Sequence, residues 1–382
     1  MDENKRPLTD PTTGAETVED AEQLDTALCM SGGGYRAMIF HLGTLLRLNE
    51  AGLLPKIDLF SSVSGGSITN GVLGLAWPKL NFDANGVASN LGSLVVDKVR
   101  TLADETVDEE SIVLGVLWFG TVSDRVAGAY DKYLFDGANL QQLPDKPRFV
   151  FNATNVQTRS LFRFSKPYAA DYRIGLWRNP DLEISKAVTA SSAFPPVLSP
   201  CTVKVDEKVW AADGRGPLCE KPYNTHLVLT DGGVYDNLGL ESPWKRSKTI
   251  YVSDAGGATP AEPDPQENWV GHSKRVLDLV DTQVRSLRKR MLIQAYKAKE
   301  KAGGYWGIRQ DISEYKAPGR FDVPFDRSLA LANTPTRLKK MDDTLQERLI
   351  NWGYAITDAA LRSYPHPELD GPKGLPYPGS GI

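Results

Sequence analysis

Three glycine-rich turns, each directly after a short apolar segment, constrain the fold of this chain more than any other feature. They are Ser31–Gly34 after Ala27–Met30, Ser64–Gly66 after Ile57–Val63, and Asp231–Gly233 after His226–Thr230. Apolar residues at helical spacing follow the first turn, and small and apolar residues follow the second. This alternation of strand, turn and helix predicts an α/β fold with a parallel sheet. Because the carboxyl ends of parallel strands meet at one edge, we expect the three turns to converge there.

The rest of the chain continues the pattern. The predicted strands are Arg148–Thr154, with Leu161–Phe164 as its hairpin partner, and Thr249–Ser253; the predicted helices are Leu182–Ala193, about 273–301 and about 336–362. Residues 200–224 are predicted to form a polar excursion rich in Gly and Pro. We therefore expect an acidic segment over 1–25, an α/β domain over 26–255 with a helical insertion at about 80–145, and a helical extension over 256–382 that packs on the same domain.

Composition excludes several classes of protein. Of the 382 residues, 41% are hydrophobic and 24% are charged, which is ordinary for a globular protein and too apolar for a disordered one. The net charge of -4 argues against a nucleic-acid polymer as partner. The three cysteines make no disulfide framework and have no zinc spacing with the four histidines, so we expect a reducing compartment and no metal.

The acidity of the chain is concentrated at its start. The first 25 residues carry eight acids and two bases, and the remainder carries a net charge of +2. This start lacks the basic and apolar regions of a signal peptide. No apolar run approaches the roughly 18 residues that span a bilayer, and the longest is Ile112–Phe119. We expect a cytoplasmic protein, peripheral to the inner membrane.

Ser64 occupies a turn that resembles a nucleophile elbow. The segment Ser62-Val63-Ser64-Gly65-Gly66 lies between a predicted strand and a predicted helix, as in G-x-S-x-G, with Ser62 replacing the first glycine. Such a turn projects the hydroxyl into a cleft, and small neighbours such as Gly65 and Gly66 let the chain double back. The following helix would direct its positive end toward the site. The alternative is a serine that only caps the helix.

The turn Gly32-Gly33-Gly34 would expose successive amides at a helix N-terminus, where anions bind. It could hold the oxyanion of an acyl transfer or a phosphate, and Arg36 in the first helical turn could add positive charge. The alternative for Arg36 is an ordinary surface arginine. A dinucleotide site is disfavoured because Asp58 stands at the start of its strand, and the G-x-x-x-x-G-K-[ST] pattern is absent.

Asp231, followed by Gly232 and Gly233, is a candidate base for Ser64. Of the four histidines, His272 alone, in a predicted polar loop, has a place compatible with a triad histidine. A carboxylate can serve as the base alone if its surroundings raise its proton affinity. The alternative is a common Asp-Gly turn.

Taken together, these segments resemble the patatin-like phospholipases, which are related to the cytosolic phospholipases A. The resemblance rests on SGGGYRAM, SVSGGS, AVTASSAFPPVLSP and LTDGGVYDNLG, in this order and spacing across about residues 27–255. It implies a three-layer α/β/α sandwich with a mainly parallel sheet, and residues 270–362 look like the C-terminal helical extension of bacterial members.

The resemblance also implies a chemistry. Ser64 would attack a fatty-acyl ester of a membrane phospholipid and form an acyl-enzyme, and Asp231 would take its proton and later activate water. Amides of the Gly32–Gly34 loop, with Arg36 nearby, would stabilise the oxyanion, and no cofactor would be needed. Lysophospholipid, neutral lipid and thioester substrates remain open. So do a membrane-degrading effector of antiviral signalling gated by a cyclic nucleotide, and a binding scaffold.

The predicted helix at about 273–301 is strongly basic. It holds nine Lys or Arg and three acids, and Val276, Val280, Val284, Leu287 and Met291 form an apolar stripe. Arg285, Arg288, Lys289 and Arg290 cluster near this stripe and could contact anionic lipid, an anionic regulator or a second subunit. The alternative is an amphipathic core helix with a solvated basic face. The oligomeric state stays open, and Ile112–Phe119 could form a lid over the site.

Overall fold

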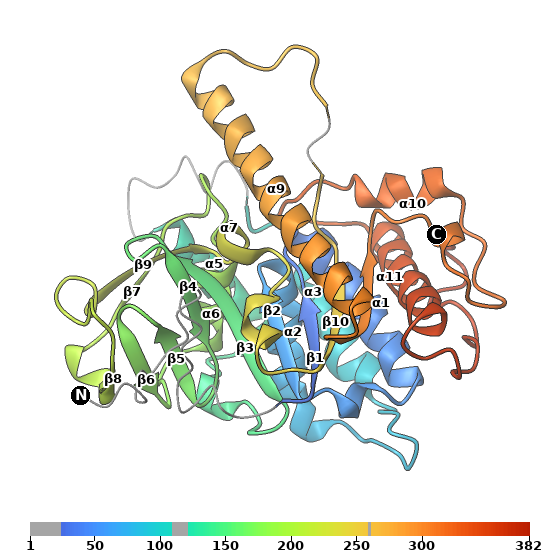
Figure 1. Cartoon of the computed structure of the whole chain (residues 1–382), viewed down its shortest axis with the longest axis horizontal. Coiled ribbons are helices and arrows are strands. Elements are labelled where there is room, and N and C mark those ends of the chain that lie inside the picture. Colours follow the sequence, from blue (N-terminus) through green and yellow to red (C-terminus); the bar gives the residue numbers. More distant parts are fainter. Residues whose placement is uncertain (1–23, 109–120, 259–260) are drawn as a thin grey trace.

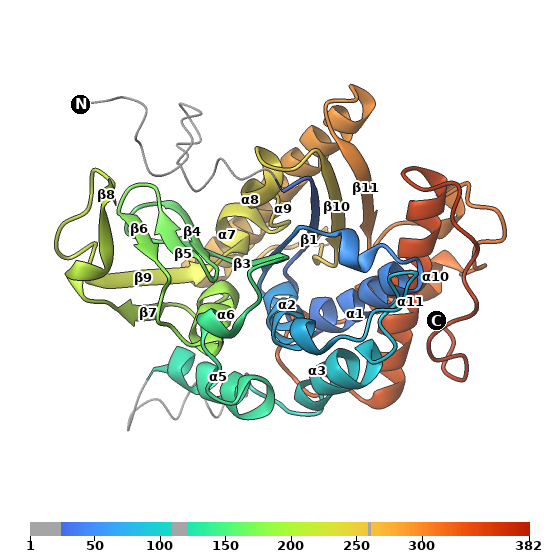
Figure 2. The ribbon, with the colours of Figure 1, turned by 90° about the horizontal axis from the view of Figure 1, so that it is seen from below.

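The computed structural model describes residues 24–108, 121–258 and 261–382. Its centre is a run of five parallel strands in the order β11-β10-β1-β2-β3 (Figures 1 and 2). Their bounds are β1 Thr26–Met30, β2 Leu59–Val63, β3 Arg148–Asn155, β10 Thr249–Asp254 and β11 Ala302–Gly307. Every residue of β2 is buried, because helices cover both faces of these strands.

Antiparallel strands extend the sheet beyond β3. They are β4 Ser160–Phe164, β5 Tyr168–Asp171, β6 Gly175–Arg178, β7 Cys201–Lys204, β8 Trp210–Arg215 and β9 His226–Asp231. The predicted hairpin is confirmed, because β4 pairs with β3 in antiparallel register. The expectation of a plain polar excursion over 200–224 is wrong, since β7 and β8 lie there. Both strands are short and bounded by Gly, Pro and charged residues, which hid them in the sequence.

Helices cover the two faces of the parallel strands (Figure 2). On one face lie α1 Gly34–Glu50, α2 Gly65–Ala76, α3 Asp97–Ala103 and α11 Asp343–Ser363; on the other lie α7 Gly233–Asp236, α8 Glu241–Trp244 and α9 Trp269–Lys297. The remaining helices are α5 Val122–Tyr130, α6 Ile184–Ser192 and α10 Phe325–Ala332. The predicted three-layer α/β/α architecture is confirmed.

Residues 80–145 are helical and irregular where they are described. Beside α3 and α5 they contain two π-helical turns, Gly92–Val96 and Asp131–Phe135. The candidate lid Ile112–Phe119 lies outside the described residues, as does most of the acidic segment 1–25.

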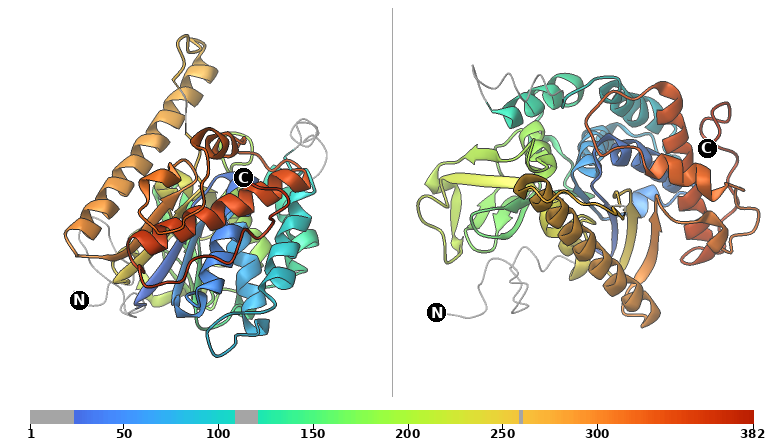
Figure 3. Two further views of the ribbon diagram at one scale, coloured as in Figure 1. Left: turned by 90° about the vertical axis from the view of Figure 1, so that its right-hand side faces the viewer. Right: turned by 90° about the horizontal axis from the view of Figure 1, so that it is seen from above.

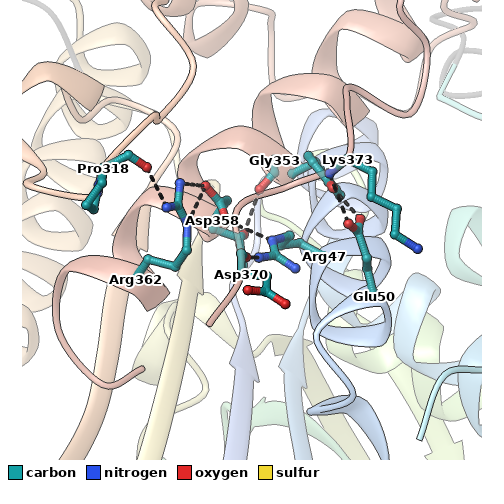
Figure 4. Close-up of polar contacts among 10 residues, drawn as sticks. Arg47, Glu50, Pro318, Gly353, Asp358, Arg362, Asp370 and Lys373 are labelled. Atoms are coloured by element: carbon teal, nitrogen blue, oxygen red, sulfur yellow. Dashed lines mark hydrogen bonds and ion pairs between the residues drawn. The ribbon is translucent and has the colours of Figure 1, made fainter. Parts of the chain in front are cut away.

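The C-terminal extension packs on the same body. The helices α1 and α11 cross closely, because a Cβ on Gly353 would lie 2.1 Å from the Phe40 carbonyl oxygen. Beside this crossing, buried Asp358 pairs with Arg47 at 2.9 Å and with Arg362 at 2.7 Å (Figure 4). The extension is not purely helical, since it also supplies the edge strand β11.

Helix α9 projects from the body (Figures 1 and 3). Its C-terminal part is anchored by Leu292 and Ala295, both of which are buried. Its N-terminal part exposes apolar side chains, among them Trp269 at 81% and Leu279 at 56%. The interpretation as a core helix is therefore wrong for the projecting part. No helix in the described ranges is long and apolar enough to cross a membrane.

Candidate active site

The three glycine-rich turns meet at one edge of the sheet. A Cβ on Gly32 would lie 3.0 Å from Ser64 Cβ, and the side-chain oxygen of Asn237 lies against both Gly32 and Gly233. One part of the expected geometry is wrong. Strand β9 pairs antiparallel with β3, Asp231 opposite Ala153, so Asp231 reaches this edge from outside the parallel strands.

Ser64 has the strained backbone of an elbow. Its φ of 52° and ψ of -123° lie outside the regions that a non-glycine residue ordinarily adopts. The alternative of a plain helix cap is wrong, because the Ser64 side chain makes no capping hydrogen bond to α2. The side chain is 7% exposed.

Ser191 in α6 holds the elbow in place. The Ser64 amide donates to the carbonyl oxygen and to Oγ of Ser191, both at 3.1 Å. Ser191 Oγ in turn donates to the Asn152 carbonyl at 2.6 Å. The same Ser191 carbonyl accepts from the Gly232 amide at 3.1 Å. One residue thus fixes the positions of both the elbow and the aspartate turn.

Ser62, which departs from the usual elbow glycine, is buried in a polar network. Its Oγ donates to the Val150 carbonyl at 3.1 Å and accepts from Asn70 Nδ2 at 2.8 Å. Ser67 Oγ lies 2.9 Å from the same atom. A glycine could make none of these side-chain contacts, so the serine contributes to the rigidity of the turn.

Asp231 is buried, and burial raises the pKa of its carboxyl to about 7. The Gly233 amide, which donates to Oδ1 at 2.7 Å, and the nearby Ser64 side chain act in the opposite direction. The alternative of a plain Asp-Gly turn thus explains the hydrogen bond to Oδ1 but gives no role to Oδ2. Oδ2 is buried and has no hydrogen-bond partner among the described residues. That oxygen can accept a proton.

The backbone amides of the Gly32–Gly34 loop differ in whether they already have a hydrogen-bond acceptor. The Gly32 amide donates to the Asn237 carbonyl at 3.1 Å, so it is unsuited to the predicted role as an oxyanion donor. The amides of Gly33 and Gly34 have no acceptor among the described residues. Gly34, at φ 58°, also lies directly against Gly65, on which a Cβ would approach the Gly34 carbonyl oxygen to 2.1 Å. Two free amides therefore adjoin the elbow.

Arg36 is neither a surface arginine nor a free cation. It is buried, and its Nε and Nη2 donate to the Ala255 carbonyl at 3.2 and 3.0 Å. Burial, together with Arg285 and Arg309, lowers its pKa to about 10. Because its donors go to backbone carbonyls, Arg36 positions the segment beside the glycine loop; a direct contact with an oxyanion stays a prediction.

In the part of the chain that the structure describes, no hydrogen bond joins any of the four histidines to Ser64 or Asp231. His41 is buried between Ser31 and Ser253, and burial lowers its pKa to about 4. His366 lies 2.6 Å from the Tyr251 hydroxyl. His272 belongs to the exposed part of α9 instead of a loop, and His226 opens β9, at the strand end opposite Asp231. The described ranges also contain no group of His, Cys, Asp or Glu arranged to hold a metal ion.

The predicted basic cluster of α9 is not one free surface. Arg288 pairs with Glu241 at 2.8 Å and with Asp236 at 3.5 Å, so it anchors the helix. Arg285 donates to the Gly257 carbonyl, and Lys289 lies over the Tyr305 ring. Arg290 alone of these four is exposed.

Two site residues were missed from the sequence. Ser191 lies in the segment AVTASSAFPPVLSP, which carries part of the resemblance, but nothing in that segment signals its contact with Ser64. Asn237 follows the aspartate turn and, through its carbonyl, occupies the Gly32 amide. Both act through long-range contacts that no local pattern reveals.

A family model and several solved structures match this chain. A family model described as patatin-like phospholipase matches residues 28–244, whereas no curated protein matches the chain. Human GIVD cytosolic phospholipase A2 is 14% identical, with a TM-score of 0.50 over 87% of this chain and 58% of that chain. Its complex with methyl gamma-linolenyl fluorophosphonate and terbium chloride is 16% identical, with a TM-score of 0.51 over 93% and 60%.

This chain spans less than two thirds of the human enzyme, and at such low identity the likeness shows a shared fold. The family model, by contrast, covers more than half of the chain, including Ser64 and Asp231. The chain therefore belongs to the patatin-like phospholipase family.

Proposed function

We propose that the protein is a lipid acyl hydrolase that cleaves fatty-acyl esters of membrane phospholipids through a Ser64/Asp231 dyad. The observation that carries the proposal is the elbow serine beside a buried carboxyl with a pKa of about 7. Such a carboxyl is about half ionised at neutral pH and can accept the proton of an adjacent hydroxyl. The family of the chain directs the proposal to lipid esters.

In the proposed acylation, Ser64 Oγ attacks the ester carbonyl carbon while its proton passes to Asp231 Oδ2. The carbonyl electron pair moves to oxygen, and the amides of Gly33 and Gly34 donate to this oxyanion at the positive end of α1. Collapse of the tetrahedral intermediate breaks the ester C–O bond. The departing lysolipid oxygen takes the proton from Asp231, which leaves an acyl-serine.

Deacylation repeats the sequence with water. Asp231 accepts a proton from water as the water oxygen attacks the acyl carbonyl, and the same two amides stabilise the second oxyanion. The bond to Ser64 Oγ then breaks, Ser64 regains its proton from Asp231, and a fatty acid leaves. No metal or cofactor enters the balance.

The exposed part of α9 supports a transient contact with the phospholipid surface. Val276, Leu279 and Val280 are all about half exposed there, which is typical of an interfacial helix. The helix also adjoins the site, because Asp281 raises the pKa of Asp231 and Arg288 pairs with Asp236. A membrane bound to this face would therefore lie near Ser64.

Release of fatty acid from defined phospholipid vesicles tests the activity. We expect release by the unmodified protein and a loss of about 10⁴-fold or more in Ser64→Ala and Asp231→Ala. Lysophospholipid and acyl-thioester substrates, each with and without a cyclic dinucleotide, separate the alternatives. A fluorophosphonate should label Ser64. Activity retained by Ser64→Ala would refute the dyad.

Vesicle flotation tests the membrane contact separately. Leu279→Ser with Val280→Ser should lower the bound fraction, because both side chains are exposed on α9. Val156→Ser, which removes an equally exposed apolar residue from the turn between β3 and β4, is the matched control. Equal binding by all three proteins would exclude α9 as the contact.

A further inference from the structure

A small polar cavity lies between α9 and the carboxyl ends of β10 and β11. It has a volume of about 160 Å³ and is lined by three basic side chains, Arg285, Lys289 and Arg309, together with Asp254 and Tyr305. Ser64 and Asp231 do not line it. The cavity has room for several waters, each of which takes about 30 Å³ in the liquid.

The basic side chains exceed the acidic groups that face them. Asp254 is the acid that lines the cavity, and both of its oxygens are used, by the Gly256 amide at 2.9 Å and by the Tyr305 hydroxyl at 2.6 Å. Lys289 has neither an ion pair nor a hydrogen-bond acceptor among the described residues, although it lies 4.4 Å from the centre of the Tyr305 ring. Among the side chains that line the cavity, three are cationic and one is anionic, so its wall carries a net positive charge.

The three basic side chains that line the cavity are coupled electrostatically. Arg285 lowers the pKa of both Lys289 and Arg309, in each case after the larger effect of burial. Acids oppose this repulsion: Asp254 raises the pKa of Lys289 by more than Arg285 lowers it, Glu314 also raises it, and Asp281 on α9 faces Arg285. The positive potential at the cavity wall therefore rests on the excess of cations among its lining side chains.

A second, larger cavity adjoins the first. Its volume is about 750 Å³, and it shares Lys289, Tyr305 and Gln310 with the small cavity. Its walls include the aromatic residues Tyr296, Tyr315 and Tyr364. A ligand with an anionic group in the small cavity therefore has space for an organic part beside it.

We infer that the small cavity binds the phosphate group of a phosphate ester, with the organic part of the ligand in the larger cavity. Arginine and lysine side chains are the usual protein ligands of phosphate. The phosphate could come from a lipid headgroup or from a soluble phosphate ester, and its recognition is the same in both cases.

The site adjoins the glycine loop without using Ser64. Arg285 donates to the Gly257 carbonyl, and Arg36 donates to the neighbouring Ala255 carbonyl. The Ala255 oxygen lies against Gly33, on which a Cβ would approach it to 2.8 Å. Binding can therefore be measured in Ser64→Ala, where turnover is absent, so failure of the phosphate site and failure of the dyad are distinguishable.

Isothermal titration of the full-length Ser64→Ala protein at fixed ionic strength tests the inference. The probes are inorganic phosphate, glycerol 3-phosphate and glycerophosphocholine. We expect saturable binding, weakened about tenfold or more by Lys289→Gln, because this variant loses a charge-assisted hydrogen bond. Arg309→Gln should weaken binding less, because Nη1 and Nη2 of Arg309 already donate to the Ala332 carbonyl and to Asn333 Oδ1. Arg290→Gln, an exposed neighbour that does not line the cavity, should bind as the parent does.

The outcomes separate the sources of phosphate. Binding of glycerophosphocholine in competition with phosphate identifies a lipid headgroup, and binding of phosphate and glycerol 3-phosphate alone identifies a soluble ester. Thermal unfolding of each variant shows whether it is folded. If Arg309→Gln is unfolded, the result with Lys289→Gln decides the test. Absence of saturable binding by the parent, or equal weakening by Arg290→Gln and Lys289→Gln, overturns the inference.

Discussion

Ser64 and Ser191 are joined twice, because the Ser64 amide donates to both the backbone carbonyl and the hydroxyl of Ser191 at 3.1 Å. The same carbonyl accepts from Gly232, next to Asp231. The relative position of the proposed nucleophile and base thus depends on a residue that need not touch substrate. Ser191 is a positioning residue, and this role can be tested.

Ser191→Ala should lower kcat by about tenfold or more with a smaller change in KM, because small misplacements of a nucleophile are costly. It should also lower the free energy of unfolding by about 1–3 kcal/mol, since the Asn152 carbonyl loses its donor. Ser185→Ala removes a buried hydroxyl at the other end of α6 and is the control. A Ser191→Ala protein that loses stability but keeps its kcat would contradict the positioning role.

The pKa of Asp231 predicts an acid limb in the activity profile. The base must be ionised, and burial raises its pKa to about 7, so kcat/KM should fall about tenfold per pH unit well below pH 7. Initial rates on one soluble ester between pH 5 and 9 give this profile. A flat profile from pH 5 to 8 would exclude Asp231 as the base.

The same raised pKa predicts how Asp231 affects stability. A carboxyl whose folded pKa is above its unfolded value binds more protons in the folded state, so its contribution falls as the pH rises from about 4 to about 7. Asp231→Asn cannot ionise, and its gain in melting temperature over the parent should be larger at pH 8 than at pH 5. Thermal unfolding at both pH values measures this difference, and a larger gain at pH 5 would reverse the sign.

Gly34 should not tolerate a side chain. Its φ is 58°, and a Cβ would lie 2.8 Å from the Arg337 carbonyl oxygen, so Gly34→Ala should lose activity and at least about 1 kcal/mol of stability. Gly319→Ala is the control, because Gly319 has φ 62° but open space around its Cα. Kinetics and urea unfolding of both variants separate the clash from the dihedral cost. Equal losses in the two variants would mean that contact with Arg337 is unimportant.

The buried Asp358 should be essential to the attachment of α11. Asp358→Asn leaves two nearly buried guanidinium groups, those of Arg47 and Arg362, without their shared carboxylate. Loss of one partner from a buried ion pair typically costs about 3–5 kcal/mol, and urea unfolding should show a loss of this order. Asp343→Asn on the same helix breaks an exposed pair with Arg100 and should cost less than about 1 kcal/mol. Similar costs for both variants would show that burial of the pair is unimportant.

Local patterns in the sequence sufficed for the elements that carry Ser64 and Asp231, because glycine turns after apolar strands are local signals. They failed where the outcome depends on distant partners. Strand β11 begins Ala302-Gly303-Gly304, a weak strand pattern, and forms because β10 offers it an edge. The antiparallel entry of β9 likewise depends on pairing with β3. The Gly32 amide was predicted to serve the oxyanion because no local pattern indicates that the distant Asn237 carbonyl accepts its hydrogen bond.

The anchoring of α9 has a mechanical consequence. The helix is 29 residues long, and its fixed part is held by Arg288 to Asp236, five residues after Asp231. The helix is thus fixed beside the aspartate turn, and its exposed part extends from there to Trp269. Because this anchor pairs with Asp236, a displacement of the exposed end of α9 would act on the segment that carries the proposed base Asp231.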